Sequence, residues 1–146
     1  MDTLRREFLA GERPDHVLVY VAERAVDDAD ALAAHGEHVG DGVALVLEAE
    51  RGRAVFERAT GIGAMDFAGA AMDLEGDVHS DCTGGECPRA HSDEPEEDHG
   101  VRLLFAFAEE QNREVDGLYA EGDVIHAYAA CDCGATYSDR WLAGER

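Results

Sequence analysis

Four cysteines in two close pairs are the residues whose types and spacing best support chemistry. Cys82 and Cys87 are separated by four residues in a polar segment, whereas Cys131 and Cys133 are separated by a single residue at the end of an apolar stretch. Thiolates are favoured ligands of zinc, and closed structural zinc sites typically take four of them in two short-range pairs. The cysteines therefore predict a metal site. Four protein ligands leave no position for water, so the site is predicted to be structural.

The residues around each pair suit such a site. Gly84 and Gly85 tolerate positive φ, so we expect the first loop to curl and turn both sulfurs inward. Residues two apart on an extended strand project to the same face, which would bring Cys131 and Cys133 side by side. Gly134 then permits a tight turn. The spacings differ from the usual Cys-x2-Cys knuckle, which leaves alternatives open.

One alternative site has three cysteines and either His79 or His91, and another has free thiols or a disulfide instead of a metal. His126 has the opposite strand parity from Cys131 and Cys133, so it is predicted to be a packed or edge histidine and not a ligand. The remaining histidines show no partner pattern and are predicted to lie at the surface: His16, His35, His38 and His99.

A thiol-dependent enzyme or redox protein that uses Cys131 and Cys133 is the main alternative function. Cys-x-Cys is not the usual oxidoreductase spacing, and the chain has no catalytic-triad or phosphate-loop pattern. A role other than catalysis is therefore favoured. Nucleic-acid binding is disfavoured because the twelve arginines are scattered and form no basic stripe.

The apolar stretches predict the elements that would position these residues. Segments 16–22 and 42–48 are apolar on both faces, as in central strands covered on both sides. A helix through 27–35 between them predicts a βαβ unit with a parallel, right-handed crossover. The remaining predicted elements are helices at 3–10, 50–60, 64–73 and 109–123, a strand at 101–108, and a hairpin of 124–131 with 135–141.

The predicted fold is a single α/β domain over 1–146, with a mixed sheet of about five strands, an N-terminal βαβ unit and a C-terminal hairpin that carries the Cys-x-Cys turn. Met65, Phe67, Ala68, Ala71 and Met72 form the apolar face of the helix at 64–73. Segment 74–100 is predicted to be a long acidic Gly/Pro-rich loop, which the metal would pin to the hairpin.

The composition is strongly acidic. The chain has 33 Asp and Glu against 12 basic residues, all of them Arg, and a net charge of -21, yet 45% of its residues are hydrophobic. This pattern indicates adaptation to molar salt, where the Debye length is roughly 3 Å and repulsion between carboxylates is screened. The charge is therefore weak evidence about partners. The N-terminus has no apolar signal region, and no apolar run is long enough to cross a membrane, which predicts a cytoplasmic protein.

Three segments carry a resemblance to a known family: EFLAGERPD at 7–15, TGGEC at 83–87 and YAEGDVIHAYAACDCGATYSDRW at 119–141. With them the acidic, lysine-free chain resembles a small uncharacterised family of halophilic archaeal proteins, a domain of unknown function with paired cysteines. The resemblance spans nearly the whole chain and implies a halophilic archaeal host and a cytoplasmic compartment, but no activity. The sequence thus predicts a small metal-binding protein, zinc being the favoured metal, that serves as an interaction or regulatory module with an unidentified protein partner.

Overall fold

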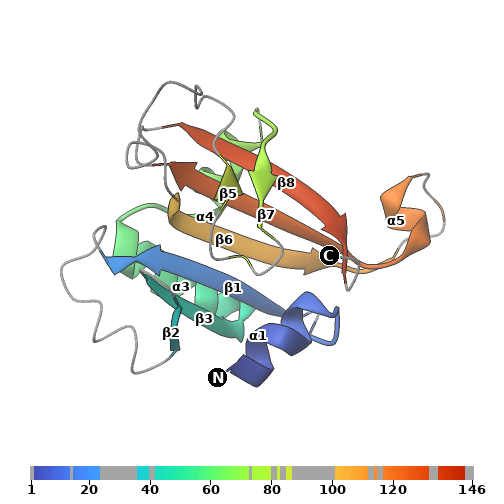
Figure 1. The fold of residues 1–146 in the computed structure, drawn as a ribbon, viewed down its shortest axis with the longest axis horizontal. Coiled ribbons are helices and arrows are strands. Elements are labelled where there is room, and N and C mark those ends of the chain that lie inside the picture. The colour runs from blue at the N-terminus through green and yellow to red at the C-terminus, as the bar shows by residue number, and fades with distance from the viewer. Residues whose placement is uncertain are drawn as a thin grey trace.

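A six-stranded antiparallel sheet organises the molecule, and both of its faces are covered (Figure 1). The computed structural model describes residues 2–13, 15–23, 36–39, 42–72, 74–79, 82, 85–86, 101–111, 114, 117–131 and 135–143. The strands of the sheet are β1 (His16–Ala22), β2 (Glu37–Val39), β3 (Gly42–Glu48), β6 (Val101–Glu109), β7 (Val124–Cys131) and β8 (Thr136–Leu142). The other elements are the helices α1 (Asp2–Leu9), α3 (Ala49–Thr60), α4 (Ala64–Ala71) and α5 (Leu118–Glu121), and a ribbon of β4 (Asp77–Val78) with β5 (Gly85–Glu86).

The strand directions correct one prediction. The strand order is β2-β3-β1-β6-β7-β8, and every neighbouring pair is antiparallel. The predicted parallel pairing of 16–22 with 42–48 is wrong, and so is the mixed character of the sheet, whereas the predicted size of about five strands is close to the six observed. Because β1 and β2 each pair antiparallel with β3, they run in the same direction on either side of it. The predicted helix at 27–35 lies outside the described residues. The α/β composition and the C-terminal hairpin of β7 with β8 are confirmed.

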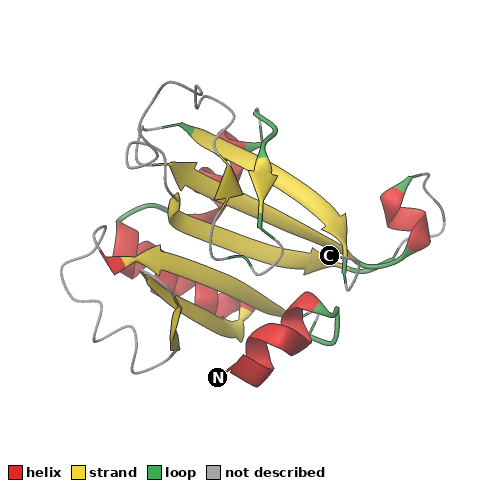
Figure 2. Ribbon diagram, in the orientation of Figure 1, coloured by secondary structure: helices red, strands yellow, loops and turns green. Residues whose placement is uncertain are grey.

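Two apolar clusters, one on each face, explain why β1 is apolar throughout. Val17, Val19 and Val21 belong to the cluster beneath α3 and α4, whereas Leu18 and Tyr20 belong to the opposite cluster. That opposite face is covered by α1 near β1 and β3, and by the β4–β5 ribbon near β7 and β8 (Figures 1 and 2). The prediction of a strand covered on both sides is therefore confirmed.

Helices α3 and α4 pack as one layer through aromatic rings. Phe56 is fully buried, with its ring centroid 5.3 Å from that of Phe67 on α4 and 5.6 Å from that of Phe105 on β6. Gly52 lets α3 approach the sheet, because a Cβ at this position would come within 2.1 Å of Val17 Cγ2. The layer thus depends on a small residue in the middle of a helix.

Helix α4 buries three of the five residues predicted for its apolar face and exposes the other two. Its buried residues are Ala64, Phe67, Ala68 and Ala71. Met65 and Met72 were predicted to belong to the buried face, yet their side chains are 61% and 63% exposed. The buried positions follow helical spacing around Phe67, and this spacing directs both methionines outward.

The predicted helix at 109–123 is reduced to α5, a single turn. Gly117 adopts a left-handed φ of 83°, which ends any helix running through it. Gln111 closes the connection, since its backbone N–H donates to Asp123 Oδ1 and its side-chain amide donates to the Ala120 carbonyl, both at 2.8 Å. None of the helices in the described ranges is long and apolar enough to span a membrane.

Candidate functional site

The segment that leads to Cys82 is held along the edge of β8. Ser138 N–H donates to the Leu74 carbonyl at 2.8 Å, and Gly76 N–H donates to the Ser138 carbonyl at 2.9 Å. Glu75 forms an isolated parallel bridge with Ser138. The prediction that 74–100 is a loop throughout is therefore wrong for its first residues. Backbone hydrogen bonds to β8 order this part of the chain.

The ribbon continues this attachment. Val78 N–H donates to the Asp139 carboxylate at 3.1 Å, and the Val78 side chain is only 2% exposed. Asp77 and Val78 then pair with Glu86 and Gly85 as an antiparallel ribbon. A polar sequence thus acquires β-structure because one aliphatic side chain and one carboxylate anchor it to the sheet.

Cys82 lies in the turn between the two strands of this ribbon. Its N–H donates to the His79 carbonyl at 2.9 Å, its φ is 59°, and its side chain is fully buried. The left-handed conformation disfavours a residue with a Cβ by about 1–2 kcal/mol, so surrounding contacts must maintain it. The prediction that Gly85 supplies a positive φ is wrong, because Gly85 is part of β5 and the left-handed residue is Cys82 itself. Gly84 lies outside the described residues.

Cys131 is the last residue of β7. Its N–H donates to the Ala135 carbonyl at 2.8 Å, next to the pair Ala130 and Thr136, and this bond closes the hairpin around residues 132–134. The Cys131 side chain is 1% exposed. The hairpin therefore fixes this cysteine at the end of the sheet where β6 begins, opposite Val101.

One cysteine from each predicted pair is buried on the same face of the sheet. Cys82 and Cys131 belong to the same buried apolar cluster, which also includes Val78, Val101 and Tyr137. Cys87 and Cys133, with Gly134, lie outside the described residues. Among the residues that the structure does describe, no group of three or more His, Cys, Asp or Glu is placed to hold a metal.

The buried position of both cysteines limits their chemistry. Reactive cysteines occupy partly exposed, electropositive surroundings, whereas buried structural cysteines are inert unless a metal or a conformational change engages them. At 0% and 1% exposure, Cys82 and Cys131 resemble the second class. This burial does not favour the thiol-enzyme alternative.

The parity argument for His126 is supported. Its ring stacks on Phe107 with centroids 5.0 Å apart, and its Nε2 lies 3.6 Å from Glu109 Oε1. Burial lowers the pKa of His126 below its ordinary value; Glu109 opposes this shift and Arg140 adds to it. His126 is on the face opposite to Cys131 and packs against β6, as predicted for a packed histidine.

Three of the other histidines are among the described residues, and they differ in exposure. His79 is exposed, and its carbonyl accepts the Cys82 N–H. His38 is also exposed, with Nδ1 3.2 Å from Glu23 Oε1, which confirms its predicted surface position. His16 is only 17% exposed, so the prediction of a surface residue is wrong there. Three histidines lie outside the described residues: His35, His91 and His99.

Comparison with known protein families gives one match. Residues 36–144 match a family of unknown function, DUF5807. The chain belongs to this family. No curated protein and no solved structure matches it. The predicted membership of a domain of unknown function is confirmed, and the family description assigns no activity.

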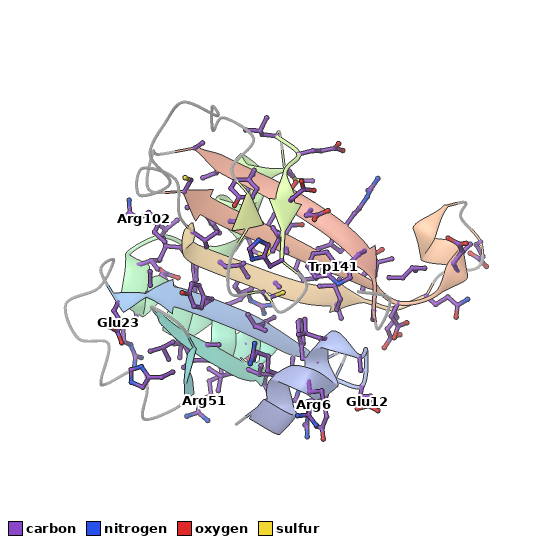
Figure 3. The ribbon with its side chains drawn as sticks, viewed as in Figure 1. Arg6, Glu12, Glu23, Arg51, Arg102 and Trp141 are labelled. Atoms are coloured by element: carbon purple, nitrogen blue, oxygen red, sulfur yellow. The ribbon has the colours of Figure 1, made fainter. Side chains whose placement is uncertain are left out.

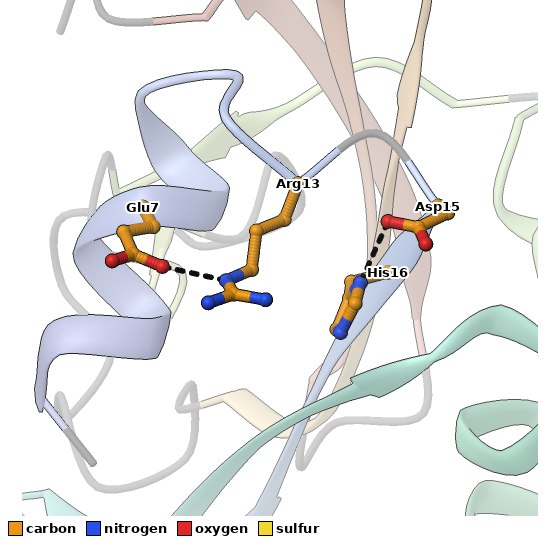
Figure 4. A network of polar contacts seen from close by, with 4 residues as sticks. All are labelled: Glu7, Arg13, Asp15 and His16. Carbon is orange, nitrogen blue, oxygen red and sulfur yellow. Dashed lines mark hydrogen bonds and ion pairs between the residues drawn. The ribbon is translucent and has the colours of Figure 1, made fainter.

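The DUF5807 match includes every cysteine and leaves out α1 and β1. In the part before the match, Arg13 Nε donates to Glu7 Oε2 at 2.6 Å, and His16 Nδ1 lies 2.8 Å from Asp15 Oδ1 (Figure 4). The hydrogen bond with His16 lowers the pKa of Asp15, with smaller contributions from the backbone and Arg13. These polar contacts join α1 to the start of β1. The pairing of Arg13 with Glu7 could not be predicted from the sequence, because it forms only after the turn that follows α1 is fixed.

Proposed function

We propose that this DUF5807 protein is a small cytosolic protein of a halophilic archaeon that binds one structural zinc ion through Cys82, Cys87, Cys131 and Cys133. We further propose that it serves as an interaction or regulatory module. The observation that supports the proposal is the burial of Cys82 and Cys131 in the apolar cluster on one face of the sheet, although they come from distant segments of the chain.

The donor set fits zinc. Four thiols from two short-range pairs match the ligands of closed tetrahedral sites. Cys87 directly follows β5, and Cys133 follows Cys131 by two residues, so chain connectivity keeps each close to a described strand end. The left-handed conformation of Cys82 is a second supporting observation, because strained backbone is typically found where a ligand or function requires it.

A bound ion would supply a cross-link between the ribbon and the hairpin. Without it, a few hydrogen bonds hold residues 74–79 to β8, and each contributes about 0.5–1.5 kcal/mol. Structural zinc contributes apparent binding energies of about 10–16 kcal/mol in finger peptides. The metal would therefore dominate the stability of this region.

Serine variants of the two outer cysteines test the proposal. Cys87→Ser and Cys133→Ser are preferable to changes at Cys82 or Cys131, where a hydroxyl would enter the apolar cluster and destabilise the fold. The measurement is zinc per chain after purification in molar KCl without chelator. We expect the parent to contain one zinc ion and both variants to lose it.

Two histidine variants complete this test. His79→Ala examines the alternative of three cysteines with a histidine, and His38→Ala is the matched control because His38 is also exposed and is paired with Glu23. Both variants should keep their zinc. A parent without metal, or serine variants that retain it, would contradict the proposal. A metal-free parent with one fast-reacting thiol at Cys131 or Cys133 would favour the thiol enzyme instead.

The halophilic host is supported by the lysine-free composition and the net charge of -21. At low ionic strength the carboxylates repel one another over longer distances, so folding should require salt. Comparing thermal unfolding in molar and in millimolar KCl tests this part of the proposal independently of the metal.

A further inference from the structure

The helical layer formed by α3 and α4 has balanced charge. Segment 49–72 has three basic and three acidic residues and is therefore neutral, as is segment 2–13 around α1, whereas the whole chain carries -21. The layer covers one face of the sheet, behind the strands in Figure 2. Its charged residues are Glu50, Arg51, Arg53, Glu57, Arg58 and Asp66. A second copy of this acidic chain is therefore repelled less at this layer than at the acidic parts of the surface.

Five of the six described exposed residues of α3 form a self-complementary stripe, and the sixth, Arg53, lies at its edge. Five exposed residues follow the spacing i, i+1, i+4, i+7 and i+8, which places them on one face of a helix: Glu50, Arg51, Ala54, Glu57 and Arg58. Figure 3 labels Arg51 on this helix. Around Ala54 the charges are arranged with opposite sign. Glu50, four residues before Ala54, corresponds to Arg58, four residues after it. Arg51, three residues before Ala54, corresponds to Glu57, three residues after it.

This arrangement fits a two-fold axis at Ala54. In an isologous pair the same surface contacts itself, so residues before the axis meet residues after it. If two copies of α3 pack antiparallel, Glu50 meets Arg58 of the second copy and Arg51 meets Glu57 of the second copy, each twice. Ala54 meets itself across the axis, where its small side chain permits close approach.

Helix α4 adds apolar surface beside the stripe. In the described ranges, the exposed large hydrophobic side chains are those of Ile62, Met65 and Met72. Met65 and Met72 are seven residues apart and so lie on one side of the helix, with Gly69 exposed between them. If the two-fold axis is perpendicular to α3, then α4 of one copy lies opposite α4 of the second copy. The flexible methionine side chains can adapt to this contact.

We propose that the α3–α4 face is the interface through which two copies of this chain form a two-fold symmetric dimer. Two helices about 10 Å wide and about 12–18 Å long give a footprint of roughly 300 Å² per copy. A standard interface buries about 800 Å² per partner, so the dimer should be weak and should form more readily in high salt, which screens the overall repulsion. The proposal does not rest on the zinc site, because Cys82 and Cys131 belong to the opposite face of the sheet.

A charge-swap series tests the pairing specifically. The full chain, Arg51→Glu, Glu57→Arg and the double variant are compared by sedimentation equilibrium in molar KCl. Each single variant replaces two ion pairs with two like-charge contacts, whereas the double variant recreates both pairs. Molar salt also weakens these exposed contacts, so each single variant should raise the dimer Kd by about threefold or more, and the double variant should restore the Kd of the parent. Both positions are exposed, so thermal unfolding should confirm that every variant is folded.

A matched pair at two exposed alanines supplies the control. Ala54→Glu places two carboxylates at the axis and should abolish the dimer, whereas Ala10→Glu adds the same charge beside α1 on the opposite face of the sheet and should leave the dimer intact. A parent that stays monomeric at the highest soluble concentration in molar salt would overturn the proposal. So would a double variant as weakened as the single variants, or Ala10→Glu and Ala54→Glu with equal effects.

Discussion

Gly52 provides a quantitative test of how α3 packs on the sheet. Replacing a helix-interior glycine with alanine normally stabilises a protein by up to about 1 kcal/mol. At Gly52 the added Cβ would lie 2.1 Å from Val17 Cγ2, far inside the contact distance of roughly 3.5–4.0 Å between carbon atoms. Val17 is 2% exposed and β-branched, so it has little freedom to move.

The expected effect of Gly52→Ala is therefore a net loss. Overpacking in a core costs about 1–3 kcal/mol, and an approach this close puts the cost in the upper part of that range, about 2–3 kcal/mol. Subtracting the gain in helix propensity of about 1 kcal/mol leaves a destabilisation of about 1–2 kcal/mol. In a chain of this length, 1 kcal/mol corresponds to about 3–4 °C in the thermal midpoint. The midpoint in molar KCl should thus fall by several degrees.

Gly69 is the matched control for this substitution. It also lies within a helix, but a Cβ there would have no atom within 4 Å, so Gly69→Ala should stabilise the chain by about 0.5–1 kcal/mol. Thermal or urea unfolding of both variants at dilute concentration is the assay. If Gly52→Ala stabilises the chain as much as Gly69→Ala does, the close approach of α3 to β1 is refuted.

Three further perturbations have definite expected outcomes. Transfer from molar to millimolar salt should lower the thermal midpoint because 33 acidic residues lose their screening, and an unchanged midpoint would contradict the halophilic origin. Burial lowers the pKa of His126 in the folded state, so the unfolded chain binds more protons and stability should decrease as the pH falls below about 6.5. His126→Gln should weaken this pH dependence. Identical pH profiles for the parent and the variant would contradict the role of His126. Asp139→Ala removes the acceptor of the Val78 N–H and should lower the stability of the ribbon by about 1–2 kcal/mol while the sheet stays folded. The Val78 amide should then exchange hydrogen faster. Unchanged protection of this amide would contradict the anchoring role of Asp139.

The long strands could be located from the sequence. The strands predicted at 16–22 and 42–48 have the observed bounds, because a run that is apolar on both faces needs a covered position in a sheet. Their mutual direction could not be predicted in this way, since an apolar run shows that both faces are covered and not which way the neighbour runs. On the far side of β3, the strand that runs in the same direction as β1 is β2, a three-residue segment without an apolar pattern.

Elements that depend on distant contacts were not predictable. Apart from Val78, the ribbon of β4 with β5 consists of acidic residues and a glycine, and it is held by Val78, Asp139 and the edge of β8. Local propensity carries no signal for such long-range anchoring. The inward face of α4 was misjudged for a related reason: methionine is apolar, but the direction in which Met65 points is set by the packing of Phe67 against Phe56.

The candidate metal site stays a prediction. Residue type and pairing directed attention to the cysteines, and Cys82 and Cys131 are both buried in the apolar cluster on one face of the sheet. The left-handed conformation of Cys82 could not be predicted, because positive φ is ordinarily assigned to glycine and two glycines lie nearby in the sequence. Binding by Cys87 and Cys133 remains a prediction.

Native mass spectrometry of the full chain, purified in molar salt without chelator, tests the central claim most directly. The zinc proposal predicts a mass increased by one zinc ion, with all four cysteines protected from alkylation until the metal is removed. The mass of the bare chain, with cysteines that react at once, would contradict a structural zinc site.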